Sequence, residues 1–100
     1  MIKLCATSAL DGGFPARIEV DGYPPLAVYR HHQEYFVTDD TCTHGAASLC
    51  DGYQDGELIE CPFHGGKFNI KTGEAIEYPC TEALNIYPIL IVEGFVCLAR

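Results

Sequence analysis

The sequence predicts an all-β fold in which an antiparallel sheet scaffold carries an inserted site. Short apolar or alternating runs recur between turn signals along the 100 residues, and none has the length and 3.6-residue period of a helix. Gly- and Pro-containing turns separate these runs. Between residues 40 and 56 the alternation stops, and cysteine, histidine and glycine gather instead. We therefore expect a single domain over residues 1–100, with the site in a subdomain of about 40–77.

The first part of the chain is predicted to supply four scaffold strands. Apolar alternation places them at 2–7, 16–20, 26–31 and 34–39. The last two strands are separated by only His32-Gln33, so we expect them to pair as a hairpin.

The second part is predicted to return to strand structure after the site. Candidate strands lie at 57–61, 67–69, 83–87, 89–92 and 95–99. The last two are expected to turn through Glu93-Gly94. Within the site region, 46–49 is the one segment where we expect a short helical turn.

Composition limits the class of partner and the compartment. Fourteen acidic and six basic residues give a net charge of −8, which argues against binding nucleic acid or an anionic membrane. No apolar run has the roughly 18–20 residues of a membrane helix, and residues 1–10 do not resemble an export signal. We therefore expect a cytoplasmic protein. In a reducing compartment, six cysteines favour metal binding over disulfides.

Two pairs of potential metal ligands follow one another in the site region. One residue separates Cys42 from His44, and two separate Cys61 from His64. Two thiolates and two imidazoles can bind a tetrahedral zinc ion, or a [2Fe–2S] cluster with the cysteines on one iron and the histidines on the other. Common zinc modules keep like ligands together, whereas each pair here is mixed. The mixed pairs favour two loops that clamp a two-iron cluster, with zinc as the alternative.

A known family carries the same pattern of ligands. The runs CTHG at 42–45 and CPFHGG at 61–66 resemble the Rieske iron–sulfur motif, and the resemblance extends over nearly the whole chain. It points in particular to the small Rieske-type ferredoxins of aromatic-ring-hydroxylating dioxygenase systems. The resemblance implies cysteine ligands for the inner iron and histidine ligands for the outer, more exposed iron: Cys42, Cys61, His44 and His64.

The same resemblance implies a function and partners. Such a ferredoxin is not an enzyme; it carries one electron from a flavin-dependent NAD(P)H ferredoxin reductase to the terminal oxygenase, in the catabolism of aromatic hydrocarbons. The Rieske-type small subunit of a nitrite reductase remains an alternative, as does a zinc-stabilised interaction module. The oxygenase itself is disfavoured, because the remaining histidines, His31 and His32, are adjacent and suit no mononuclear iron site.

Charge counting and missing donors predict a low potential within the Rieske range. Two ferric ions, two sulfides and two thiolates sum to zero, so one electron brings the cluster to −1. High-potential relatives carry a disulfide at the positions of Ala47 and Phe63 and hydroxyl donors at those of Gly66 and Phe68. This chain has none of these side chains.

The residues around the ligands predict how partners approach. From residue 31 to 66 there are seven acidic residues and no Lys or Arg, so we expect the cluster end to attract basic patches on partners. The other cysteines are expected to be non-ligands. We interpret Cys5, Cys80 and Cys97 as small apolar residues in or beside strands, and Cys50 as lying outside the ligand spacing.

Overall fold

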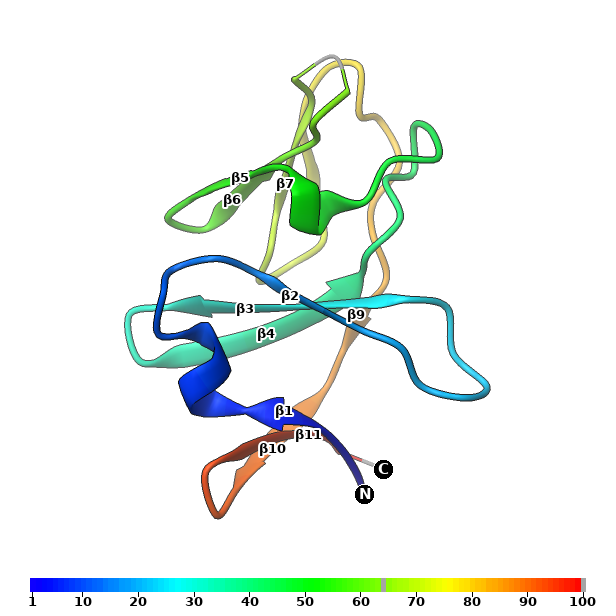
Figure 1. The fold of residues 1–100 in the computed structure, drawn as a ribbon. Coiled ribbons are helices and arrows are strands. Elements are labelled where there is room, and N and C mark those ends of the chain that lie inside the picture. The colour runs from blue at the N-terminus through cyan, green and yellow to red at the C-terminus, as the bar shows by residue number, and fades with distance from the viewer. Residues whose placement is uncertain (64, 100) are drawn as a thin grey trace.

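The computed structural model describes residues 1–63 and 65–99, which form three antiparallel sheets (Figure 1). The terminal sheet contains, in spatial order, β1 (Ile2–Ala6), β11 (Phe95–Leu98) and β10 (Ile89–Val92). The central sheet contains β2 (Ala16–Ile18), β3 (Leu26–His31), β4 (Glu34–Asp39) and β9 (Ile86–Tyr87). The distal sheet contains β5 (Tyr53–Asp55), β6 (Leu58–Glu60), β7 (Lys67–Asn69) and β8 (Ala75–Glu77).

The central sheet lies between the other two, and strand β3 is buried on both of its faces. Figure 1 shows the terminal sheet, with the N-terminus, on one side and the distal sheet on the other. Leu26 and Val28 pack into the core beneath the terminal sheet, whereas Ala27 and Tyr29 pack into the core beneath the distal sheet. Successive side chains of a strand point to opposite faces, so one strand serves two cores.

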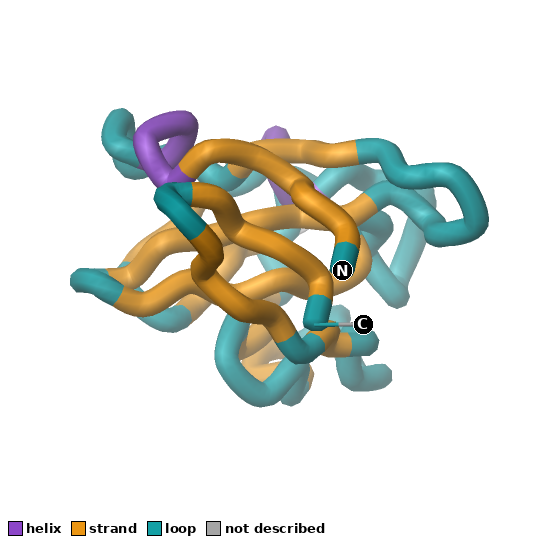
Figure 2. The backbone as a smooth tube through the Cα atoms, turned by 90° about the horizontal axis from the view of Figure 1, so that it is seen from below, coloured by secondary structure: helices purple, strands orange, loops and turns teal. Residues whose placement is uncertain are grey.

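The two predicted hairpins are confirmed. Strands β3 and β4 pair from Leu26 with Asp39 to His31 with Glu34, and His32 takes the positive φ of 59° that this tight turn requires. Strands β10 and β11 turn through Glu93 and Gly94, both with positive φ. Figure 2 looks from the terminal-sheet side and shows the strands joined by loops and turns.

Several other strands and turns differ from those that the sequence predicts. The sequence does not predict strands β5 and β8, because each has only three residues and two of the three are exposed. The strand expected at 83–87 shortens to β9, since Leu84 N–H donates to the carbonyl of Gly73 as the chain crosses from the distal to the central sheet. The helical turn expected at 46–49 forms instead as a 3-10 helix at Leu49–Asp51, and a second one covers Thr7–Leu10.

The described part of the chain contains no α-helix, which agrees with the predicted all-β class. Among these residues no helix is long and apolar enough to cross a membrane.

Candidate metal centre

The two motif cysteines begin two loops of matching construction. Cys42 lies in the loop after β4, and its N–H donates to the carbonyl of Ala47 at 2.9 Å. Cys61 begins the β6–β7 loop, and its N–H donates to the carbonyl of Gly66 at 2.7 Å. Each loop is thus closed by a backbone hydrogen bond from the cysteine to the residue five positions further on. The loops are small closed turns that fix where each sulfur lies.

Both sulfurs are buried and receive backbone hydrogen bonds. Cys42 is 3% exposed and Cys61 is 1% exposed. The N–H of His44 donates to Cys42 Sγ at 3.4 Å, and the backbone of Phe63 makes the equivalent bond to Cys61. Burial raises the pKa of Cys61, and the Phe63 bond opposes that shift because it stabilises the thiolate. Buried sulfurs that accept N–H donors suit thiolates bound to a metal.

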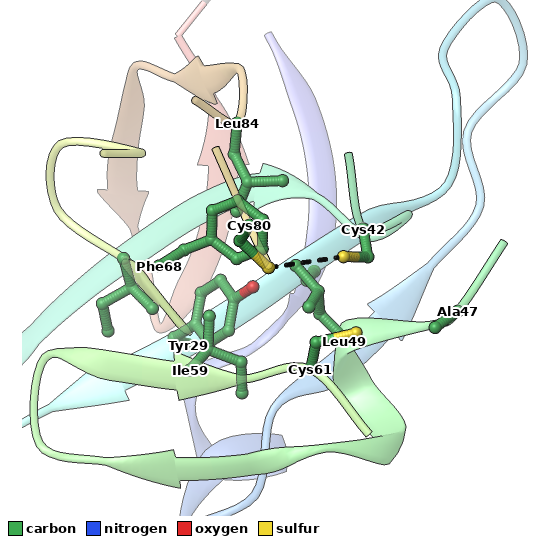
Figure 3. Close-up of a cluster of buried hydrophobic side chains, with 11 residues drawn as sticks. Tyr29, Cys42, Ala47, Leu49, Ile59, Cys61, Phe68, Cys80 and Leu84 are labelled. Atoms are coloured by element: carbon green, nitrogen blue, oxygen red, sulfur yellow. Dashed lines mark hydrogen bonds between the residues drawn. The ribbon is translucent and has the colours of Figure 1, made fainter. Parts of the chain in front are cut away.

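The structure places three of the four predicted ligands on these loops. Cys42 and Cys61 interact with each other, and both face the core beneath the distal sheet (Figure 3). The side chain of His44 is exposed at the end of its loop. His64, the fourth predicted ligand, lies outside the described residues.

A buried carboxylate holds the first loop on the scaffold. Asp40 Oδ2 accepts a hydrogen bond from Ser48 Oγ at 2.6 Å, and Oδ1 accepts one from the N–H of Cys50 at 3.1 Å. Arg17 Nε, on β2, lies 3.7 Å from Asp40 Oδ2. Asp40 is one of the seven acidic residues that were expected to attract basic partners, but its side chain is buried and paired inside the protein, so it does not contribute to such a surface.

The sequence does not predict the contact that Cys80 makes with the first ligand loop. Cys80 lies in the segment that leads from β8 to β9, not in a strand, and its Sγ is 3.8 Å from Cys42 Sγ. Burial, followed by the interaction with Cys42, raises the pKa of Cys80 to about 12. The same segment contacts the first loop a second time, where Thr43 Oγ1 donates to the carbonyl of Glu82 at 2.8 Å. No sequence signal links Cys80 to the ligand loops, because the contact depends on how the chain crosses between sheets.

Gly66 leaves the space that the Cys80 sulfur fills. A Cβ at position 66 would lie 2.3 Å from Cys80 Sγ and 3.0 Å from Cys80 N. We expect Gly66→Ala to lower the free energy of unfolding by about 1–3 kcal/mol, because the added methyl group overpacks a buried contact. Chemical denaturation followed through the visible absorption of the purified protein measures this loss.

A matched substitution and a double variant control that experiment. Gly12→Ala meets only an ordinary contact at 3.8 Å and should leave the denaturation midpoint near that of the parent. Adding Cys80→Ala to Gly66→Ala should recover part of the loss. A Gly66→Ala protein as stable as the parent would show that the Gly66–Cys80 contact is wrong.

The chain belongs to the family described as the Rieske [2Fe-2S] domain, whose model matches residues 1–88. One [2Fe–2S] cluster is therefore its cofactor. The residues fit this group, since two buried sulfurs, each with a backbone N–H donor, provide the thiolate pair that a Rieske cluster needs. The alternative of a zinc-stabilised module is not supported.

Within this family the chain is similar to ferredoxins of dioxygenase systems. Ferredoxin CarAc of Metapseudomonas resinovorans is 47% identical over 98 residues, which cover 98% of this chain and 92% of that protein. The solved ferredoxin of Sphingomonas yanoikuyae B1 is also 47% identical, with a TM-score of 0.96 over 99% of this chain and 97% of that one. A structure titled as a complex of reduced oxygenase and oxidized ferredoxin in carbazole 1,9a-dioxygenase contains a chain that is 47% identical, with a TM-score of 0.91 over 98% of this chain and 91% of that one. These names favour an electron carrier over the nitrite reductase subunit.

Proposed function

We propose that this protein is a cytoplasmic one-electron carrier that links a flavin-dependent NAD(P)H ferredoxin reductase to the terminal oxygenase of an aromatic-ring-hydroxylating dioxygenase. The observation that carries the proposal is the pair of matched loops, which bury Cys42 and Cys61 beside exposed residues of the same loops. The relatives named as ferredoxin components of such systems support it. Catalysis then belongs to the partners.

Residues 40–77 form the cluster-binding subdomain in this proposal, and the loops divide the ligands between the two irons. Cys42 and Cys61, which are buried, would bind the inner iron, and His44 and His64 would bind the outer iron. When bound, the cluster takes up and releases one electron. Because His44 is exposed, a partner can approach that side closely, which short-range electron transfer requires.

The surface beside the loops is suited to transient contact with a protein partner. Phe63, in the second loop, is 53% exposed, and Tyr78, two residues before Cys80, is 86% exposed. Exposed aromatic side chains at one end of a molecule are typical of protein contact surfaces. The acidic Glu82, held beside the first loop by Thr43, adds negative charge at the same end.

The transfer of electrons can be measured directly. The protein is reduced with dithionite and mixed in a stopped-flow instrument with the oxidised terminal oxygenase of the carbazole 1,9a-dioxygenase system. We expect the absorption of the oxidised carrier to return as the oxygenase is reduced. Electron paramagnetic resonance of the reduced protein should show the low average g value of a histidine-ligated cluster. Failure to pass electrons to any such oxygenase, or a colourless protein that holds zinc, would contradict the proposal.

The same experiment tests the electrostatic part of the proposal. We expect the second-order rate constant to fall as ionic strength rises, because salt screens the attraction between the acidic carrier and a basic oxygenase surface. Glu82→Gln should lower the rate constant at low salt and flatten this dependence. Asp21→Asn, which removes the same charge from the turn after β2, is the control and should have little effect. A rate constant independent of salt would remove the role of charge.

A further inference from the structure

A third buried sulfur lies against the two cysteines that we assign as ligands. Cys80 is 3% exposed, and its Sγ is 3.8 Å from Cys42 Sγ. Figure 3 shows the Cys80 side chain directed at Cys42, with Cys61 nearby. The ligand pattern does not use this sulfur, and at this distance it can form a hydrogen bond with Cys42.

The fold holds Cys80 in this position from several sides. The N–H of Cys80 donates to the carbonyl of Glu77, the last residue of β8, at 3.1 Å. This bond fixes the chain just after the strand. Tyr29, Phe68 and Leu84 belong to the same buried core. The absence of a side chain at Gly66 leaves room for the thiol. The sulfur is therefore fixed by packing rather than free to turn away.

The presence of a cluster decides which of the two sulfurs is the donor. A ligand sulfur is a thiolate and can only accept a hydrogen bond, whereas a non-ligand thiol can donate its S–H. A donor beside a ligand thiolate stabilises negative charge on that sulfur. The reduced cluster carries one more negative charge than the oxidised cluster, so the donor stabilises the reduced form more.

We propose that Cys80 is a positioning residue that donates an S–H hydrogen bond to the Cys42 sulfur and thereby makes the reduction potential of the cluster more positive. This inference rests on the proposed function, because it requires Cys42 to be a ligand. It assigns to a cysteine outside the motif the role of a hydrogen-bond donor to the cluster. The Cys80 sulfur fills the space that a side chain at position 66 would need, so Gly66 and Cys80 fit together only because residue 66 is glycine.

The test compares the reduction potentials of purified, cluster-containing variants. Cys80→Ala removes the donor, so its midpoint potential should shift to a more negative value. Cys80→Ser keeps a donor of similar size and should lie closer to the parent than Cys80→Ala does. Both variants should keep the parent's absorption spectrum and average g value, because the ligands are unchanged. A merely structural role for Cys80 would change stability without this ordering of the potentials.

Cys97→Ala is the matched control. Cys97 is a buried thiol of β11, in the terminal sheet, and its Sγ lies 3.8 Å from the carbonyl oxygen of Phe95. Its removal should leave the potential unchanged. An unchanged potential in Cys80→Ala, or an equal shift in Cys97→Ala, would overturn the inference. A changed average g value in Cys80→Ser would also overturn it, by making Cys80 a ligand.

A second readout uses the unmodified cysteine, in case Cys80→Ala does not assemble. With Cys42 and Cys61 bound to iron, four of the six cysteines keep an S–H group. The infrared S–H band of Cys80 should lie at lower frequency than that of Cys97, because a bond to a thiolate weakens the S–H bond. Cys97→Ala and matching variants of Cys5 and Cys50 assign the bands. Three S–H bands, or a Cys80 band at the frequency of a free thiol, would contradict the inference.

The two proposals fail in different ways. If the parent lacks the spectrum of a histidine-ligated cluster, the proposed function fails, and this inference fails with it. If the parent has that spectrum and passes electrons to the oxygenase, while Cys80→Ala keeps the parent potential, only the role of Cys80 fails.

Discussion

Cys61→Ala is expected to yield a protein without a cluster, and Cys42→Ala is expected to do the same. Each change removes one of the two buried motif sulfurs, which interact in the core beneath the distal sheet. One remaining thiolate cannot hold the inner iron, so the visible absorption should disappear and the iron content should fall from two per chain to near zero. Alanine is preferred to serine because a serine oxygen can itself bind iron.

The loss of the cluster should also weaken the fold. A metal site that forms only in the folded state contributes its binding free energy to folding. We therefore expect both variants to unfold at lower denaturant concentration than the parent, as measured by circular dichroism. Cys5→Ala, in β1 of the terminal sheet, is the matched control and should keep both iron and colour. Retention of the parent spectrum by Cys61→Ala would contradict the ligand assignment.

Asp40→Ala is expected to lower the free energy of unfolding by about 2–4 kcal/mol, because two donors inside the protein each lose a partner at a cost of about 1–2 kcal/mol. These donors are Ser48 Oγ and the N–H of Cys50, which fix the far end of the first ligand loop. The ion pair with Arg17 adds little to this value, since the arginine side chain is about half exposed. We also expect the variant to lose its cluster faster on standing, since the loop that carries Cys42 is no longer tied to the scaffold.

Two further variants test whether the hydrogen bonds of Asp40, rather than the loss of one negative charge, account for the effect. Asp40→Asn keeps the volume and one acceptor oxygen, so its loss of stability should be smaller than that of Asp40→Ala. Asp51→Ala, an exposed acid at the end of the neighbouring 3-10 helix, should change the unfolding free energy by less than 0.5 kcal/mol or so. If Asp40→Ala and Asp51→Ala have equal effects, the buried carboxylate does not hold the loop.

The sequence predicts those parts of the structure that depend on residues close together in the chain. Alternating apolar residues and a two-residue connection predicted β3 and β4 with the bounds that the structure has. The spacing of Cys42 and His44 placed them on one loop, as found. Such predictions succeed because strand alternation and loop closure depend on residues that are near one another in the chain.

Contacts between distant segments could not be predicted in this way. Cys80 meets Cys42 across 38 positions of sequence, and Arg17 of β2 reaches Asp40 from the neighbouring part of the central sheet. Both contacts depend on how whole sheets pack, which no local pattern of residues encodes. Strand β8 is not predicted for the same reason, because pairing with β7 rather than its own composition makes it a strand.

The burial of β3 on both faces determines the order in which parts of the protein unfold. Because this strand contributes side chains to both cores, neither half of the protein can separate without exposing apolar surface that belongs to the other. The amides of Leu26 to Tyr29 should therefore be among the last to exchange with deuterated solvent, and only through opening of the whole chain. Ejecting the cluster would loosen the ligand loops first, while this strand keeps the remainder assembled and ready to be reloaded with iron and sulfide.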